Sequence, residues 1–125
     1  MPKTEEPIRV LILEDNPVIS MSLEAIIEDV APAIVTVSAS LAAAEKVVEQ
    51  QFDLALLDIE LTNGKTYEIA RALDKKQVPV AFVTSHPKDR VPDEFRRFTL
   101  IAKPFTAAQI EQAILAATKG KRSSS

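Results

Sequence analysis

Five short apolar runs, separated by longer segments with helical periodicity, constrain the fold of this chain more than any other feature. The runs span residues 8–13, 34–37, 54–57, 80–83 and 100–102. Strands that alternate with helices predict repeated strand–helix units and a mostly parallel sheet. Four runs are almost entirely apolar, as expected for strands covered on both faces, whereas Thr36 in the second run is typical of an edge strand.

Helix signals occur in the segments between these runs. Asn16 and Pro17 are typical of an N-cap and a first helical position, and Ser40 can cap a second helix. Pro87 and Pro92 restrict a fourth helix to about residues 93–98, or to a turn. Three apolar stripes have the spacing of a helix face: Leu23, Ile26, Ile27 and Val30; Leu41, Ala44 and Val48; and Ile69, Ala70 and Leu73, the last group following Gly64.

The last helix has the clearest boundaries in the sequence. Thr106 and Gln109 have capping-box spacing, Phe105 and Ile110 have hydrophobic-staple spacing, and Gly120 can end the helix. Its buried stripe consists of Ile110, Ala113, Ile114 and Ala117. Together the elements predict an α/β fold of the doubly wound (βα)5 flavodoxin-like type, a three-layer sandwich with parallel sheet order 2-1-3-4-5.

Length and composition narrow the classes of protein further. A chain of 125 residues with 46% hydrophobic and 26% charged residues predicts one globular domain over residues 1–120 and a disordered tail over 121–125. The chain has no cysteine and only one histidine, which excludes disulfides and multi-histidine metal sites. A net charge of -3 argues against direct nucleic-acid binding. No segment has the apolar length for membrane insertion, so we expect a cytoplasmic protein.

Polar residues follow the predicted strands at their carboxyl ends. Glu14 and Asp15 follow the first strand, Asp58 the third, Thr84 the fourth and Lys103 the fifth. In an open doubly wound sheet, ligands bind beyond the carboxyl ends of the strands, where the strand order reverses. We therefore expect the acidic pair to face Asp58 across a crevice at this edge.

Three carboxylates this close repel one another by roughly 3 kcal/mol per pair at an effective dielectric constant near 20. Either one of them is protonated or a hard divalent cation occupies the site, and Mg²⁺ suits such a set of oxygen ligands. A carboxylate beside that ion can act as nucleophile towards a phosphoryl donor. Lys103 would then neutralise phosphoryl oxygens and the Thr84 hydroxyl would donate a hydrogen bond to one of them.

Four motifs, VLILEDN, LALLDIEL, FVTS and IAKPF, resemble in order and spacing the receiver domain of two-component response regulators. The resemblance covers about residues 8–118. It implies that Asp58 is phosphorylated by a histidine kinase or phosphotransfer protein, and that Glu14, Asp15, Asp58 and the backbone carbonyl of Glu60 bind Mg²⁺. It also implies phosphoryl contacts from Thr84 and Lys103 and a cis peptide bond before Pro104.

The same resemblance implies a signalling module that catalyses at most its own phosphorylation and dephosphorylation and that acts on a downstream protein or relays the phosphoryl group. The sequence departs from the family pattern at Leu100, where members usually carry an aromatic switch residue. The segment after Thr84 is also unusual. Glu60 and His86 stand two positions after Asp58 and Thr84, where family members tune dephosphorylation, and we expect the same role for them here.

Other functions fit parts of the sequence. Residues 58–62, DIELT, approximate the DxDxT motif of phosphatases of the haloacid-dehalogenase type, although that motif follows the first strand and has a second Asp. A flavodoxin-like cofactor binder shares the sheet order, but Glu14 and Asp15 would repel its phosphate. A receiver-like interaction module without phosphorylation is a third alternative. Turnover of a phosphate ester, a bound yellow chromophore or the absence of phosphorylation would distinguish them.

Overall fold

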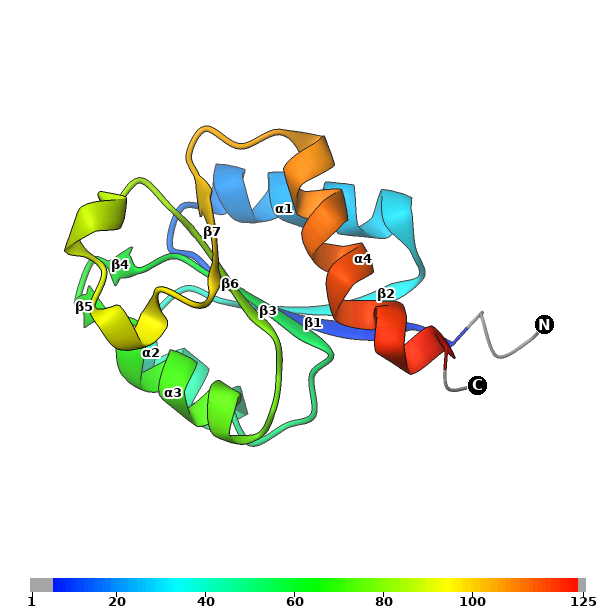
Figure 1. Cartoon of the computed structure of the whole chain (residues 1–125), viewed down its shortest axis with the longest axis horizontal. Coiled ribbons are helices and arrows are strands. Elements are labelled where there is room, and N and C mark those ends of the chain that lie inside the picture. The colour runs from blue at the N-terminus through cyan, green and yellow to red at the C-terminus, as the bar shows by residue number, and fades with distance from the viewer. Residues whose placement is uncertain (1–5, 124–125) are drawn as a thin grey trace.

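The structure is a computed structural model that describes residues 6–123, with side chains described as far as residue 118. A five-stranded parallel sheet forms its centre, in the order β2-β1-β3-β6-β7 (Figure 1). The strands are β1 (Ile8–Leu13), β2 (Ala33–Ser38), β3 (Leu54–Leu57), β6 (Val80–Thr84) and β7 (Thr99–Ala102). Because β6 and β7 are the fourth and fifth strands of this sheet in chain order, the predicted order 2-1-3-4-5 is confirmed.

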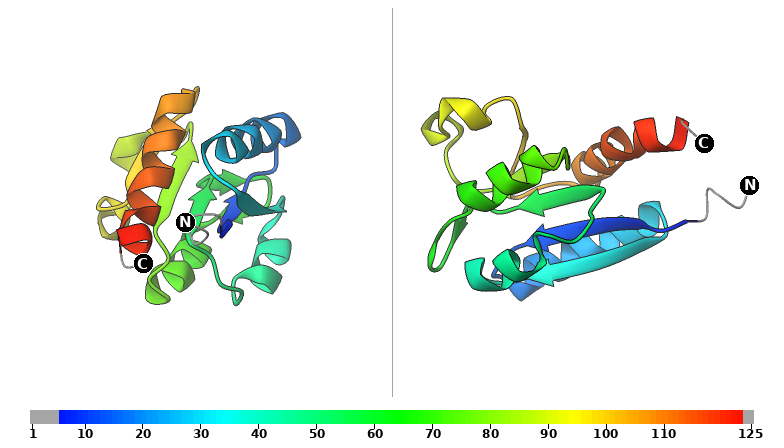
Figure 2. Two further views of the ribbon diagram at one scale, coloured as in Figure 1. Left: turned by 90° about the vertical axis from the view of Figure 1, so that its right-hand side faces the viewer. Right: turned by 90° about the horizontal axis from the view of Figure 1, so that it is seen from below.

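Two helices cover each face of the sheet, so the fold has the predicted three layers. The helices α1 (Pro17–Val30) and α4 (Ala107–Ser123) pack on one face, and α2 (Leu41–Val47) and α3 (Tyr67–Lys75) on the other (Figure 1). The view from below in Figure 2 places α2 and α3 in front of the strands. Alternate residues of β1 enter the two cores, because successive side chains of a strand point to opposite faces.

The predicted helix starts are present as hydrogen bonds. The Asn16 side chain accepts from the backbone of Val18 at 2.9 Å, and Ser40 Oγ accepts from Ala43 at 3.1 Å. Thr106 and Gln109 form the reciprocal capping box, with N–O distances of 2.9 and 3.2 Å. These local contacts satisfy backbone donors that a helix leaves unpaired in its first turn.

The end of the last helix differs from the prediction. Helix α4 continues to Ser123, so the expectation that Gly120 ends it was wrong. Gly120 is compatible with a helix interior at a cost of about 1 kcal/mol relative to alanine. The helix also extends into the segment 121–125 predicted as a disordered tail, of which residues 124–125 lie outside the described part.

Two short 3₁₀ turns, η2 (Lys88–Arg90) and η3 (Asp93–Phe95), connect β6 to β7, in the region where the sequence predicts a short fourth helix or a turn. Pro87 and Pro92 each precede one turn, and their fixed φ and missing N–H prevent a continuous helix. A small antiparallel hairpin between β3 and α3, β4 (Glu60–Leu61) with β5 (Gly64–Lys65), was not predicted. The hairpin and the turns both follow carboxyl ends of strands and so adjoin the predicted site.

Candidate functional site

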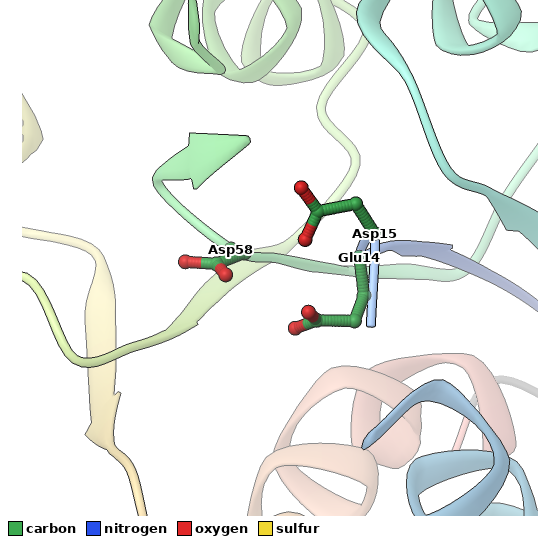
Figure 3. A group of neighbouring side chains, drawn as sticks. All are labelled: Glu14, Asp15 and Asp58. Atoms are coloured by element: carbon green, nitrogen blue, oxygen red, sulfur yellow. The ribbon is translucent and has the colours of Figure 1, made fainter. Parts of the chain in front are cut away.

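The predicted acidic residues meet at the carboxyl edge of the sheet. β1 and β3 are paired in parallel up to Leu13 and Leu57. Glu14 and Asp15, which follow β1, therefore lie beside Asp58, which follows β3. The backbone N–H of Asp58 donates to the Leu13 carbonyl at 2.9 Å, which continues the ladder by one residue. Figure 3 shows the carboxylates of Glu14 and Asp15 extending from the end of β1 towards Asp58.

These three carboxylates form a group that can hold a metal ion. One oxygen of each lies within 4.8 Å of one oxygen of both others. Glu14 is 3% exposed and Asp58 is 8% exposed, so water screens their repulsion poorly. An arrangement of converging, partly desolvated carboxylate oxygens needs a compensating positive charge.

Lys103 supplies that charge in this structure. Its ammonium group donates to Glu14 Oε1 and to Asp58 Oδ2, each at 2.9 Å. Burial lowers the pKa of Lys103, but the hydrogen bonds to the two carboxylates outweigh this effect and the pKa lies above its ordinary value. The lysine is therefore charged at neutral pH and links the end of β7 to the ends of β1 and β3.

Asp15 is held by a residue that the sequence reasoning missed. Thr62, in the turn between β4 and β5, donates to Asp15 Oδ2 from its hydroxyl at 2.7 Å and from its backbone at 2.9 Å. The hydroxyl bond is the main cause that keeps the pKa of Asp15 below its usual range. The signal in the sequence was the short polar turn after Asp58, Thr62-Asn63-Gly64, which is typical of a tight hairpin.

Thr66 is a second residue that sequence reasoning missed. Its hydroxyl is fully buried and donates to the backbone carbonyl of Asp58 at 2.6 Å. Its own N–H donates to Ile59 at 2.9 Å. Thr66 thus ties the first turn of α3 to the chain immediately around Asp58.

Thr84 ends β6, 1% exposed, with its hydroxyl beside the start of the next segment. Its Oγ1 accepts from the backbone of His86 at 3.1 Å, and its carbonyl accepts from the backbone of Lys103 at 3.0 Å. His86 Nδ1 lies 3.6 Å from Glu60 Oε1, so the two residues predicted to tune dephosphorylation are neighbours. The 3.6 Å separation is longer than a hydrogen bond.

The remaining predicted residues lie on the β7 side. The Lys103–Pro104 peptide is cis, as predicted. Leu100 is partly buried and packs against the core that contains Phe82 and Phe95. It carries no ring, and the aromatic side chains of this region come from other elements.

Comparison with known proteins now identifies the family. The family model of the response regulator receiver domain matches residues 10–115. The chain belongs to this family. The PhyR regulator of Methylorubrum extorquens is 33% identical over 110 residues, which cover 84% of this chain and 41% of PhyR. The sensor protein GacS of Pseudomonas syringae is 23% identical over 117 residues, or 13% of its own length.

Solved receiver structures agree with this assignment. SdrG from Sphingomonas melonis is 34% identical, with a TM-score of 0.77 over 89% of this chain and 96% of SdrG. The receiver domain of Erythrobacter litoralis PhyR is 29% identical, with a TM-score of 0.80 over 90% of this chain and 91% of that domain. The receiver family therefore replaces the phosphatase and flavodoxin alternatives.

The chain matches only part of each curated relative. The chain spans less than half the length of the curated relatives PhyR and GacS. Those relatives are signalling proteins by name, a regulator and a sensor. Within the described residues, no helix is both long and apolar enough to cross a lipid bilayer.

Proposed function

We propose that this receiver accepts a phosphoryl group on Asp58 in a reaction that depends on Mg²⁺. The observation that carries the proposal is the Lys103 ammonium, which lies 2.9 Å from both Glu14 and Asp58 inside an acidic group. An aspartate that only ends a strand does not require a partly buried lysine and two further carboxylates around it. A nucleophile that must receive a dianionic phosphoryl group needs positive charge on more than one side.

The acidic group fits a Mg²⁺ ion by the chemistry of its donors. Carboxylate oxygens are the ligands this ion uses, and it typically takes one or two of them while retaining waters. Glu14, Asp15, Asp58 and the backbone carbonyl of Glu60 would hold the ion. When bound, the ion would neutralise charge on the incoming phosphoryl oxygens.

The residues of the chain then have separate roles in the transfer. One Asp58 oxygen forms the bond to phosphorus while the bond from phosphorus to the donor's leaving group, an imidazole nitrogen of a phosphohistidine, breaks with its electron pair. Lys103 exchanges its hydrogen bond to the Asp58 carboxylate for a phosphoryl oxygen. The Thr84 hydroxyl, at the end of the neighbouring strand, donates to another phosphoryl oxygen.

The lifetime of the acyl phosphate depends on how water reaches it. We assign this control to Glu60 and His86, because their side chains approach each other to 3.6 Å and follow the strands that carry Asp58 and Thr84. Substitution of either by alanine should change the dephosphorylation rate several-fold in either direction. A rate unchanged in both single variants would remove this assignment.

The partners follow from the same chemistry. We propose a histidine kinase or a phosphotransfer protein as the donor, and a downstream protein as the target of the phosphorylated receiver. The receiver either signals through this contact or passes the phosphoryl group on. PhyR and GacS, by name a regulator and a sensor protein, support a role in such a pathway.

The test is incubation with Mg²⁺ and a small acyl-phosphate donor, followed by intact mass spectrometry. We expect one phosphoryl adduct on the parent protein, none on Asp58→Asn, and none in the presence of a chelator. A parent protein that gains no phosphoryl group over a range of donors would contradict the proposal and favour an interaction module without phosphorylation. An adduct that persists in Asp58→Asn would contradict the assignment to this residue.

A further inference from the structure

Tyr67, the first residue of α3, has a hydroxyl group that no part of the described chain satisfies. The oxygen is buried and has no hydrogen-bond partner among the described residues. Burial raises the pKa of Tyr67 and the charge of Glu60 raises it further, so the group is a protonated donor at neutral pH. Buried hydroxyls are normally hydrogen-bonded, and an exception calls for an explanation.

Tyr67 is fixed closely to the phosphoacceptor. The residue directly before it, Thr66, bonds to the carbonyl of Asp58 at 2.6 Å and to that of Ile59 at 2.9 Å. Rearrangement of the backbone around Asp58 therefore reaches the first turn of α3 through two short bonds. Because Tyr67 directly follows Thr66 in the chain, the same rearrangement also moves Tyr67.

The ring of Tyr67 connects α3 to the turns that follow β6. It stacks on Phe95 of η3 with a centroid distance of 4.8 Å and an interplanar angle of 13°. It also meets Phe82 edge-on at 6.2 Å, two residues before Thr84 on β6. The ring thus contacts both the strand that carries a predicted phosphoryl ligand and the segment beyond it.

The ion pairs that join this segment to α3 lie at the surface. Arg71 donates to Glu94 at 2.8 and 3.2 Å, and Arg97 donates to Asp74 at 2.6 Å. All four side chains are at least 40% exposed, and exposed ion pairs stabilise a contact only weakly. The buried ring of Phe95 attaches η3 to the rest of the domain through aromatic contacts with Tyr67 at 4.8 Å and with Phe82 at 6.0 Å.

We propose that Tyr67 transmits the state of Asp58 to residues 85–98, with its unpaired hydroxyl gaining the Glu60 carboxylate as hydrogen-bond acceptor when Asp58 is phosphorylated. This inference rests on the proposed phosphorylation. Most family members carry an aromatic switch residue at the position of Leu100, which has no ring. Tyr67 has a ring in contact with the same core. Tyr67 is a positioning residue in this account and does not contact the phosphoryl group.

The sequence of contacts starts at Thr84. Its hydroxyl accepts from the His86 backbone at 3.1 Å, and its rotation towards a phosphoryl oxygen weakens this bond. His86 then separates from Glu60, whose carboxylate is held only at 3.6 Å by His86 and at 3.8 Å by Lys65. The freed carboxylate can turn to the Tyr67 hydroxyl. A new bond there shifts the ring against Phe95 and changes the packing of η3.

The test compares the native chain with Tyr67→Phe, which keeps the ring and its stacking but removes the hydroxyl. Both proteins are treated with Mg²⁺ and an acyl-phosphate donor, their adducts are counted by intact mass, and amide hydrogen exchange is followed in residues 85–98. We expect equal adduct yields. The phosphorylation-dependent change in exchange should fall at least five-fold in Tyr67→Phe. Thr118→Val, which removes a buried hydroxyl on α4, should respond like the native chain.

A second readout uses composition, because Tyr67 is the only tyrosine and the chain has no tryptophan. The tyrosine absorbance of the native chain in the near ultraviolet therefore comes from Tyr67, with no overlap from tryptophan. We expect the tyrosine absorbance to shift to longer wavelength on phosphorylation. Glu60→Gln keeps a hydrogen-bond acceptor at this position and should keep the shift, whereas Glu60→Ala removes the acceptor and should abolish it.

The outcomes separate the two proposals. No adduct on the native chain would overturn both. An adduct with an equal exchange response in the native chain and Tyr67→Phe would overturn the role of Tyr67 and leave phosphorylation intact. An adduct with no exchange response in residues 85–98 of the native chain, or a loss of the adduct in Tyr67→Phe, would also overturn it.

Discussion

Replacement of Lys103 by methionine removes the positive charge from the acidic group while keeping most of the aliphatic side chain. Its ammonium lies 2.9 Å from an oxygen of both Glu14 and Asp58. At an effective dielectric constant of 20, each contact corresponds to about 6 kcal/mol of Coulomb attraction. The repulsion between carboxylate oxygens less than 4.8 Å apart is at least about 3 kcal/mol.

The measured effect will be smaller than these pair energies, because desolvation of the lysine opposes them and the carboxylates can protonate. Loss of one partner of a buried ion pair typically costs 3–5 kcal/mol. Lys103 is 16% exposed at its side chain, so we expect about 3 kcal/mol at pH 7 without divalent ions. With a urea dependence of about 1.5–2 kcal/mol per molar, the unfolding midpoint should fall by roughly 1.5–2 M.

The assay is urea unfolding followed by circular dichroism, with chelator and with excess Mg²⁺. Because the ion can replace the missing charge, Mg²⁺ should restore most of the stability lost in Lys103→Met. Lys76→Met is a matched control. Its ammonium also makes two hydrogen bonds, at 2.8 and 2.9 Å, but to the neutral carbonyls of Val48 and Gln50.

The control should lose about 1–2 kcal/mol from its two hydrogen bonds, equally with and without Mg²⁺. A Lys103→Met protein whose loss is as small as that of the control, or is the same with and without Mg²⁺, would refute the electrostatic account of the site. In that case Lys103 would act mainly through packing.

Two further substitutions test other parts of the site and its surroundings. Thr62→Val removes the main cause of the lowered pKa of Asp15. A carboxyl whose pKa is lowered in the folded state stabilises the fold above its unfolded pKa of about 3.9, and this contribution is lost as the pH falls through the folded pKa. The variant should therefore lose about 1 kcal/mol at pH 7, and its difference from the native chain should shrink as the pH falls below that unfolded value, measured by urea unfolding without metal. A difference that stays constant from pH 7 into the acid range would contradict the assignment. Gly64 has a φ of +146°, and an added Cβ would lie 3.1 Å from Leu41 Cδ1. Gly64→Ala should therefore lower the free energy of unfolding by about 1–3 kcal/mol in the same assay. Gly120→Ala, inside α4, should be neutral or stabilising. Similar effects at the two glycines would show that an alanine at position 64 causes no backbone strain.

The fold was predictable because its signals are local and repeated. Each buried strand reads as a continuous apolar run, and the caps at Asn16, Ser40 and Thr106 lie within three residues of the backbone groups they satisfy. The end of α4 was not predictable from Gly120 alone. A glycine favours a helix end but does not require one, and the residues after it have adequate helix propensity.

The placement of the five polar site residues followed from topology. Residues that end adjacent parallel strands must share an edge, whatever their side chains do. The contacts of Thr62 and Thr66 were not predictable in this way, because they depend on the β4–β5 hairpin, whose strands are only two residues long. Two-residue strands leave almost no periodicity in a sequence.

The aromatic contacts beyond Thr84 were also invisible in the sequence. Tyr67 and Phe95 are 28 positions apart, and their rings lie 4.8 Å apart although Phe95 belongs to a short turn and not to a predicted helix. The prolines indicated that a full helix was absent. They gave no information on where the turns would pack.

Asp58, among several neighbouring carboxylates, is the proposed acceptor of the phosphoryl group. The most direct measurement is borohydride reduction of the phosphorylated protein, which converts an aspartyl phosphate to homoserine, followed by peptide mapping. We expect homoserine at position 58, dependent on Mg²⁺. Reduction at Asp15 or Glu14 in its place, or no reduced residue despite a phosphoryl adduct, would contradict it.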